Sequence, residues 1–188
     1  MNARAALFAL CGFMAGIAPA CAASHFAGAG EITAVFAPEE DPQAALVELI
    51  AQARSRIAVQ AYVFTSKPLA EALIGAQRRG VAVEVLLDAK MHQRGNAAVQ
   101  RLLDAGVALY AVSSFATAHD KVMLVDAAAG GLCAVATGSY NFTWSAQHRN
   151  AENLLIVRHH CELAARYAEN WQAKAREVVR IGRFPLAK

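Results

Sequence analysis

Four polar side chains of different chemistry stand around two short apolar runs in the second half of the chain. His119 and Lys121 stand two apart where the first run begins, and Ser139 and Asn141 stand two apart where the second run ends. Residues two apart on a strand project to the same face, so the members of each pair are expected to share a side. An imidazole, an ammonium, a hydroxyl and a carboxamide together suit a phosphate better than a metal ion.

Each of these groups has a use in phosphoryl transfer. An imidazole attacks phosphorus or moves a proton near neutral pH, an ammonium neutralises a non-bridging oxygen, and neutral donors hold the remaining oxygens. Gly138, directly before Ser139, lets backbone approach closely. The sequence near this cluster has no paired carboxylates, no His-x-x-x-His and no Cys-x-x-Cys. We therefore expect a phosphate site that uses no metal and no cofactor.

The spacing of these residues resembles the motif of the phospholipase D superfamily. That motif runs His-x-Lys, four residues, Asp, a spacer and Gly-Ser-x-Asn, and it matches His119, Lys121, Asp126, Gly138, Ser139 and Asn141. The stretch GSYNFTWSAQHRNAEN resembles the short, exported endonuclease branch of that superfamily. The resemblance is close over residues 119–157 and loose over the rest of the mature chain. The spacer after Asp126 is longer than in the family, which a longer hairpin loop over 127–131 would absorb.

The resemblance implies a role for each matched residue. His119 would be the nucleophile that forms a phosphohistidine, and Lys121, Ser139 and Asn141 would bind the phosphoryl oxygens. Glu152 matches the acidic residue that holds the far imidazole nitrogen, which would leave Nε2 free to attack. An ordinary strand-end charge is the alternative interpretation of Glu152. Asp126 is expected to support the hairpin or a neighbouring cation, not to touch substrate.

The motif occurs once in this chain, although in-line displacement needs a nucleophile on one side of phosphorus and a proton donor on the other. Single-motif members of the family form a symmetric dimer with one joint site, so the resemblance predicts a homodimer. The competing hypothesis is an acid from the same chain. Its candidates are His92, His148, His159 and His160; the last two stand at a strand-to-helix junction that favours capping or surface roles.

The elements that must position this cluster alternate along the chain. Strand-like runs cover 31–38, 56–64, 81–88, 107–112, 121–126, 132–139 and 153–157. Helix-like runs cover 43–55, 65–80, 96–106 and 161–178. This alternation predicts a single α/β domain, a mixed β-sheet flanked by helices on both faces, as in phospholipase D-like nucleases. Residues 180–188 are expected to form a surface tail.

The first residues have the features of an export signal. Arg4 supplies a positive charge, an apolar stretch follows, and Ala20-x-Ala22 offers a cleavage site. We expect residues 1–22 to be a signal peptide, residues 23–188 the nuclease-like domain, and the location periplasmic or secreted. An uncleaved anchor is the alternative. Two cysteines, Cys133 and Cys161, remain after cleavage, and the sequence leaves open whether they form a disulfide or are two buried thiols.

The substrate follows less directly, because DNA, RNA and phospholipids all contain phosphodiesters. Without Arg4 the net charge falls from +3 to about +2, so polyanion binding would depend on local placement of cations. The candidates are Arg54, Arg56, Arg78, Arg79, Arg94, Arg101 and Arg149. Tyr140, Phe142 and Trp144 flank the turn and either stack on bases or pack beneath it.

We expect a non-specific endonuclease that cleaves DNA, possibly RNA, with no obligatory membrane partner. Two rival readings remain. One is a phospholipase D or cardiolipin-type hydrolase, which should show exposed apolar surface beside the site. The other is a nucleic-acid-binding module without activity, which the filled catalytic positions disfavour.

Overall fold

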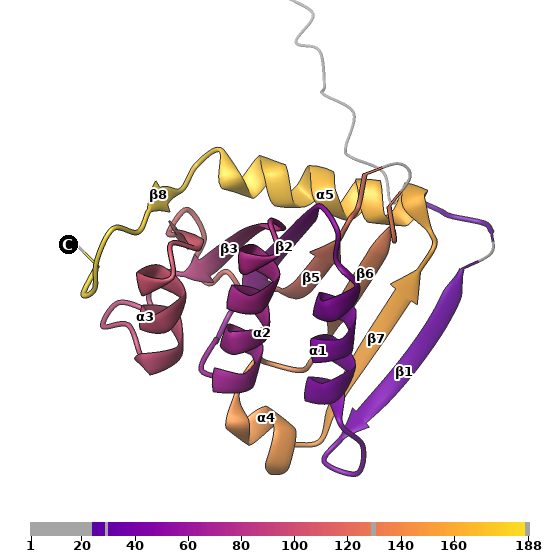
Figure 1. Cartoon of the computed structure of the whole chain (residues 1–188), viewed down its shortest axis with the longest axis horizontal. Coiled ribbons are helices and arrows are strands. Elements are labelled where there is room, and N and C mark those ends of the chain that lie inside the picture. Colours follow the sequence, from indigo (N-terminus) through magenta and orange to yellow (C-terminus); the bar gives the residue numbers. More distant parts are fainter. Residues whose placement is uncertain (1–23, 29, 129–130, 187–188) are drawn as a thin grey trace, which may run out of the picture.

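This computed structural model describes residues 24–28, 30–128 and 131–186. The strands in these residues form one mixed sheet. Figure 1 shows the sheet with helices on its two faces. The strands are β1 (Glu31–Ala37), β2 (Arg56–Ala61), β3 (Ala82–Asp88), β4 (Ala108–Val112), β5 (Lys121–Val125), β6 (Ala134–Gly138), β7 (Glu152–Arg158) and β8 (Val179–Arg180). The helices are α1 (Pro42–Gln52), α2 (Lys67–Arg78), α3 (Ala97–Asp104), α4 (Trp144–His148) and α5 (Cys161–Ala175).

The strand order is β1-β7-β6-β5-β2-β3-β4-β8. β2, β3 and β4 are parallel, and the remaining neighbours pair antiparallel. Because Lys121 pairs with Ala61 and Gly138 with Leu154, β5 and β7 begin at the edge where β2 and β6 end. β3 and β4 end there too, and we call this the site edge. Ligands of sheets with parallel strands commonly bind beyond the carboxyl ends of those strands.

Side-chain caps start three of the helices where the sequence indicated. The Asp41 carboxylate accepts a hydrogen bond from the Ala44 amide, and the Ser66 hydroxyl accepts one from the Leu69 amide. The Asn96 carbonyl oxygen accepts from the amides of Ala98 and Val99. Each cap satisfies amide groups that have no partner within the helix.

The two faces of the sheet bury separate apolar clusters. α1, α2 and α3 cover one face with side chains such as Leu46, Leu73 and Leu102. α5 covers the central strands on the other face, where Trp171 packs with Leu124 and the other members of a smaller cluster. The predicted fold class, a mixed sheet with helices on both faces, is confirmed.

Two predictions about local structure are wrong. Residues 180–186, the described part of the expected surface tail, do not form a tail, because β8 pairs with β4 and Ile181 is only 4% exposed. The helix-like runs that the sequence indicated also do not include α4. This single short helix is capped by the Thr143 hydroxyl, which accepts from the Ala146 amide at 3.1 Å. Both segments are too short for a periodic apolar pattern, so tertiary contacts decide them. The predicted signal peptide, 1–22, lies outside the described residues.

A disulfide joins Cys133, just before β6, to Cys161, the first residue of α5. It decides between the two alternatives that the sequence left open for these cysteines. The bond fastens α5 to the sheet at the edge opposite the site edge.

Candidate active site

His119 and Lys121 meet at the start of β5, as their spacing predicted. The Lys121 ammonium donates to the His119 carbonyl oxygen at 2.7 Å and lies 3.1 Å from the imidazole Nδ1. Tyr62, the residue that follows β2, lies beside both: its ring centroid is 4.3 Å from that of His119 and 4.9 Å from Lys121 Nζ. Sequence reasoning missed Tyr62, although its place just past the end of a central strand is a signal.

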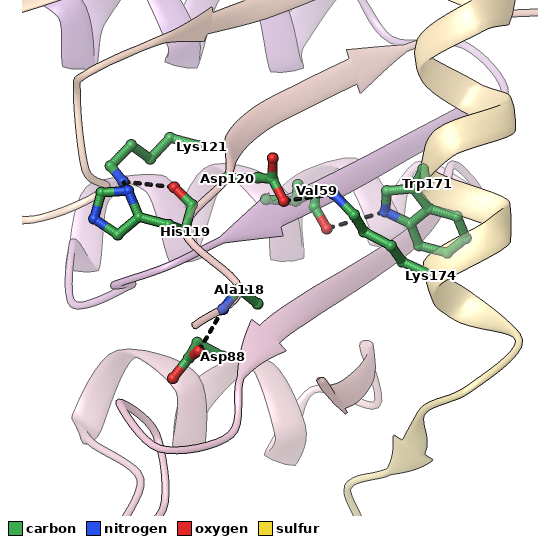
Figure 2. A network of polar contacts seen from close by, with 8 residues as sticks. All are labelled: Val59, Asp88, Ala118, His119, Asp120, Lys121, Trp171 and Lys174. Carbon is green, nitrogen blue, oxygen red and sulfur yellow. Dashed lines mark hydrogen bonds and ion pairs between the residues drawn. The ribbon is translucent and has the colours of Figure 1, made fainter. Parts of the chain in front are cut away.

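The backbone on each side of His119 is anchored to other elements (Figure 2). Before it, the Ala118 amide donates to Asp88 Oδ2 at 2.8 Å, at the end of β3. After it, Asp120 points to the opposite face of the sheet, where its carboxylate pairs with Lys174 of α5 at 2.6 Å. The Asp120 carbonyl oxygen also accepts from the Tyr62 amide at 2.9 Å. The candidate nucleophile is therefore exposed on a short segment that is fixed at both ends.

Lys121 is a mostly buried cation, with 7% of its surface exposed. Burial is the largest influence on its pKa and lowers it from the ordinary value, while the carboxylates of Glu152 and Asp120 act to raise it. A cation that has already lost much of its water interacts strongly with an incoming anion. Lys121 is thus suited to hold a phosphoryl oxygen.

Ser139 and Glu152 lie together at the ends of neighbouring strands. The Ser139 hydroxyl donates to Glu152 Oε2 at 2.5 Å, and its oxygen accepts from the Asn153 amide at 3.0 Å. Glu152 Oε1 accepts from the Asn150 side chain at 2.9 Å. Since Glu152 also acts on the pKa of Lys121, the four residues His119, Lys121, Ser139 and Glu152 gather at the site edge.

The expected contact between Glu152 and the His119 imidazole is not made within the single chain. The Glu152 carboxylate is occupied by Ser139 and Asn150, and Lys121 Nζ lies at the imidazole nitrogen that a carboxylate would need. The role of Glu152 toward His119 therefore stays a prediction.

Gly138 is required by a close backbone approach. A β-carbon at this position would lie 2.2 Å from the Asn153 carbonyl oxygen, which accepts from the amides of Ser139 and Tyr140. Asn141 follows on the same turn, and its buried Oδ1 has no hydrogen-bond partner in the described part of the chain. An orphaned polar atom beside the cluster indicates a place for a further group.

Asp126 has a structural role that differs from the one expected: its carboxylate supports neither the hairpin nor a cation, but holds the connection before β2. It lies at the far end of β5 and is 2% exposed. Its carboxylate accepts from the amides of Arg54, Ser55 and Arg56, each at 2.8 Å, and from the Ser55 hydroxyl at 2.7 Å. Burial alone would raise its pKa, but these four hydrogen bonds together lower it. Asp126 fixes the α1–β2 connection and lies away from the site edge.

The other candidate histidines differ in their surroundings. His92 is 1% exposed, accepts from the Phe64 amide and faces the Asp88 carbonyl oxygen, and burial lowers its pKa. His160 caps α5 and His159 stands beside it, both at the edge opposite the site edge. His148 ends α4 with its ring 4.9 Å from that of Trp144. The capping and surface interpretation of His159 and His160 is confirmed.

The arginines suggested for nucleic-acid binding do not gather at one place. Several are engaged elsewhere: Arg56 pairs with Glu84, Arg101 with Glu71, and Arg79 donates to the Ile50 carbonyl oxygen. Arg54 follows α1 and Arg78 ends α2, and both lie at the edge of the sheet opposite the site edge. Only Arg94 and Arg149 of that set stand in loops at the site edge.

The aromatic residues of the turn divide into two groups. Tyr140 and Phe142 are 1% exposed and belong to the core, and burial raises the pKa of Tyr140. Trp144 is 56% exposed, and the Arg149 guanidinium lies 5.1 Å from its ring centroid. Only Trp144 is therefore available for stacking.

The described residues contain neither a cluster of metal-ligating side chains nor a membrane-spanning helix. No three side chains of His, Cys, Asp or Glu come together there as a metal site would require. No helix in the described ranges is long and apolar enough to cross a bilayer.

The sequence matches a family model over residues 46–174, more than half of the chain, and that family is described as cardiolipin synthase, PLD-like domain. The chain belongs to the phospholipase D superfamily. Phosphodiester hydrolysis is the activity typical of this superfamily. The resemblance drawn from the motif is confirmed.

Curated relatives agree with this membership. Phospholipase D of Rickettsia prowazekii is 34% identical over 140 residues, which cover 74% of this chain and 65% of that protein. The mitochondrial cardiolipin hydrolase of Xenopus laevis is 35% identical over 112 residues, 60% of this chain and 50% of that protein. The chain thus spans about two thirds of the first relative and half of the second.

Solved structures share the fold. The phospholipase D family member Nuc from Salmonella typhimurium superposes with a TM-score of 0.75 at 28% identity, covering 82% of this chain and 100% of that one. NucT from Helicobacter pylori, with a TM-score of 0.68 at 20% identity, shows the same fold.

Proposed function

We propose that this chain is a phosphodiesterase, an endonuclease that cleaves DNA, and possibly RNA, through a phosphohistidine at His119. The observation that carries the proposal is the convergence of an exposed imidazole and a mostly buried ammonium 3.1 Å apart at the site edge. In this proposal Ser139 and Asn141 donate to the remaining phosphoryl oxygens, for which the Ser139 hydroxyl turns away from Glu152.

The contact between Lys121 and His119 Nδ1 also indicates which tautomer of the imidazole substrate binding must produce. An ammonium has no lone pair, so Nδ1 accepts from Lys121 and the ring proton lies on Nε2. Attack needs the other tautomer. When a phosphate oxygen draws Lys121 away, Nδ1 becomes free to donate to a carboxylate such as Glu152, and Nε2 becomes the nucleophile.

The reaction then has two balanced steps. Nε2 of His119 bonds to phosphorus while the bond to the leaving oxygen breaks, and a second group gives that oxygen a proton. Water then attacks phosphorus, the same second group takes the proton from the water, and the phosphorus–nitrogen bond breaks. Lys121 carries the cationic charge at the phosphoryl group in both steps, so we propose that no metal ion is required.

We propose that the second group is His119 of the partner subunit in a homodimer. Support comes from an exposed apolar patch of Ile32, Phe36 and Leu155, which are 67%, 53% and 38% exposed. These residues lie on the sheet face that α5 leaves uncovered at β1 and β7, and Phe36 pairs with Asn153, next to Glu152. The patch therefore ends at the site edge, and a two-fold contact that includes it is the dimer that we propose.

Mixing experiments test the shared site. Wild-type and His119→Ala chains are mixed in equal amounts and allowed to exchange. If two copies of His119 are needed at once, the mixture should have about one quarter of the activity of a sample with the same total number of chains that are all wild-type. A self-sufficient chain would retain about one half. A linear dependence on the wild-type fraction, under conditions where exchange is proven, would remove the shared site.

Nucleic acid is favoured as substrate by the surroundings of the site. Trp144 offers an exposed ring with Arg149 against it, a combination that stacks on bases and contacts phosphates. The disulfide between Cys133 and Cys161 supports the proposal that the chain works in an oxidising compartment, periplasmic or secreted.

A phospholipid or cardiolipin-type hydrolase is the second candidate. Exposed apolar side chains do stand near the site edge, among them Met91 and Phe115, each 48% exposed. The names of the Rickettsia and Xenopus relatives point the same way. Incubation with plasmid DNA, RNA and anionic phospholipid vesicles, each in the presence of EDTA, separates the candidates. Cleavage of vesicle lipid without cleavage of either nucleic acid would overturn the endonuclease proposal.

A further inference from the structure

Residues 179–186, which we call the strap, close the sheet at its last strand and reach back to the site edge. The Ile181 amide donates to the Leu109 carbonyl oxygen at 2.8 Å, and the Leu186 amide donates to that of Gln93 at 2.8 Å. Phe184 packs so tightly on Gly95 that a β-carbon there would lie 2.5 Å from its ring. The strap is therefore fixed at both ends.

A groove of about 700 Å³ runs between the strap and the sheet. Its walls are Ala89, Ala111 and Ser113 on one side and residues 179–183 with Leu186 on the other. Ala89 and Ser113 directly follow β3 and β4, so the groove opens at the site edge.

The groove carries positive charge that no group in the described part of the chain neutralises. Arg180 and Arg183 are exposed, and within the described residues their side chains form no ion pair or hydrogen bond. No acidic residue lines the groove. Arg94 is exposed in the neighbouring loop, next to the Gly95 on which Phe184 packs. Unpaired guanidinium groups of this kind suit the phosphates of a polyanion.

The sheet sets the separation between this charge and the candidate nucleophile. From β5 the order runs through β2, β3 and β4 to β8, which is four steps between neighbouring strands. At about 4.8 Å for each step, β8 lies roughly 19 Å from the strand that carries Lys121. Each strand of a DNA duplex has one phosphate for about every 3.4 Å of helix axis, so along a duplex this distance corresponds to about five or six nucleotides.

We propose that the groove of Arg180 and Arg183 is a second phosphate-binding subsite, which holds the polynucleotide strand about five or six nucleotides from the scissile phosphate. The inference rests on the proposed endonuclease function and deepens it, because the subsite has a use only for a long polyanion. A single phospholipid headgroup at His119 does not extend that far. Cleavage should therefore depend on substrate length.

The test compares the double variant Arg180→Ala/Arg183→Ala with the wild-type chain on two substrates, a 12-base-pair DNA duplex and bis(p-nitrophenyl) phosphate. On the 12-mer we expect a KM about tenfold higher at 50 mM salt, and hydrolysis of the small diester unchanged. Two lost phosphate contacts should also reduce the slope of log affinity against log salt by about 1.8 for a duplex. The Arg180→Lys/Arg183→Lys variant keeps the charge and should restore most of the affinity.

A matched control removes the same charge from the opposite edge. Arg54 and Arg78 are both exposed there, and Arg54→Ala/Arg78→Ala should leave both substrates unaffected. An unchanged KM on the 12-mer in the strap variant, or an equal rise in the control, would overturn the subsite. So would a strap variant that loses activity on anionic vesicles but not on the 12-mer. If the wild-type chain hydrolyses the small diester but no 12-mer, the endonuclease proposal itself fails.

Discussion

The Asp88 carboxylate should position His119 without contacting substrate. Asp88 is 3% exposed, and its two oxygens accept from the amides of Met91 and Ala118 at 2.9 and 2.8 Å. In Asp88→Asn only one oxygen remains, so one of these amides faces an NH₂ group whichever way the side chain turns. The anchor in front of His119 is then weakened.

The expected magnitudes follow from these contacts. Losing one hydrogen bond to a charged acceptor costs about 2 kcal/mol of unfolding free energy, which corresponds to a melting temperature lower by roughly 4 to 8 °C for a chain of this size. A displacement of about 1 Å at a reacting group costs on the order of 100-fold in rate. We therefore expect kcat on bis(p-nitrophenyl) phosphate to fall between about tenfold and 100-fold. KM should change little, because Lys121 and Ser139 are untouched.

Asp126 provides the matched control for this prediction. It is a buried carboxylate that also accepts backbone amides, but at the far edge of the sheet. Asp126→Asn should lower the melting temperature by a similar amount or more and leave kcat of the folded enzyme unchanged. The reasoning is refuted if Asp88→Asn loses stability but keeps its kcat, or if both variants lose kcat equally.

Further outcomes are expected from the same structure. Lys174→Met, which removes the anchor behind His119, should lower kcat while changing stability by no more than about 1 kcal/mol, because Asp120 is partly exposed; Lys174→Arg should restore the rate. Burial lowers the pKa of His92 from its ordinary value of 6.5, so the unfolded chain binds the extra proton first and stability should decline as pH falls through 6.5. Urea unfolding between pH 8 and 5 measures this slope, which should be smaller in His92→Gln. Phe36→Glu should dissociate the dimer in sedimentation experiments, whereas Val179→Glu, exposed at the opposite side of the sheet, should not. Turnover should persist in EDTA, and a complete loss that a divalent ion restores would contradict the role given to Lys121.

The sequence indicated β1 to β7 and the main cluster because both depend on local rules. The period of two along a strand places His119 and Lys121 on one side and sends Asp120 to the other, and both the contact of His119 with Lys121 and the pair of Asp120 with Lys174 agree with it. Helix starts were equally readable, because Asp41 and Ser66 cap their own helices within three residues.

The remaining features depend on which strands become neighbours, and a single sequence does not specify that. Ser139 reaches Glu152 only because β6 and β7 pair in one register, and that contact competes with the bond expected between Glu152 and His119. Tyr62 joins the site because β2 ends beside β5. The strap acquires its place from pairing with β4 and from the fit of Phe184 on Gly95, so its arginines gave no signal as a group.

Direct capture of the covalent intermediate tests the central claim. The enzyme is mixed with end-labelled DNA, denatured within milliseconds at alkaline pH, where a phosphorus–nitrogen bond to histidine survives, and digested for mass spectrometry. The account predicts a nucleotide adduct on the peptide that contains His119, and no adduct and no cleavage in His119→Ala. An unmodified residue 119 during turnover, together with full cleavage by that variant, would contradict it.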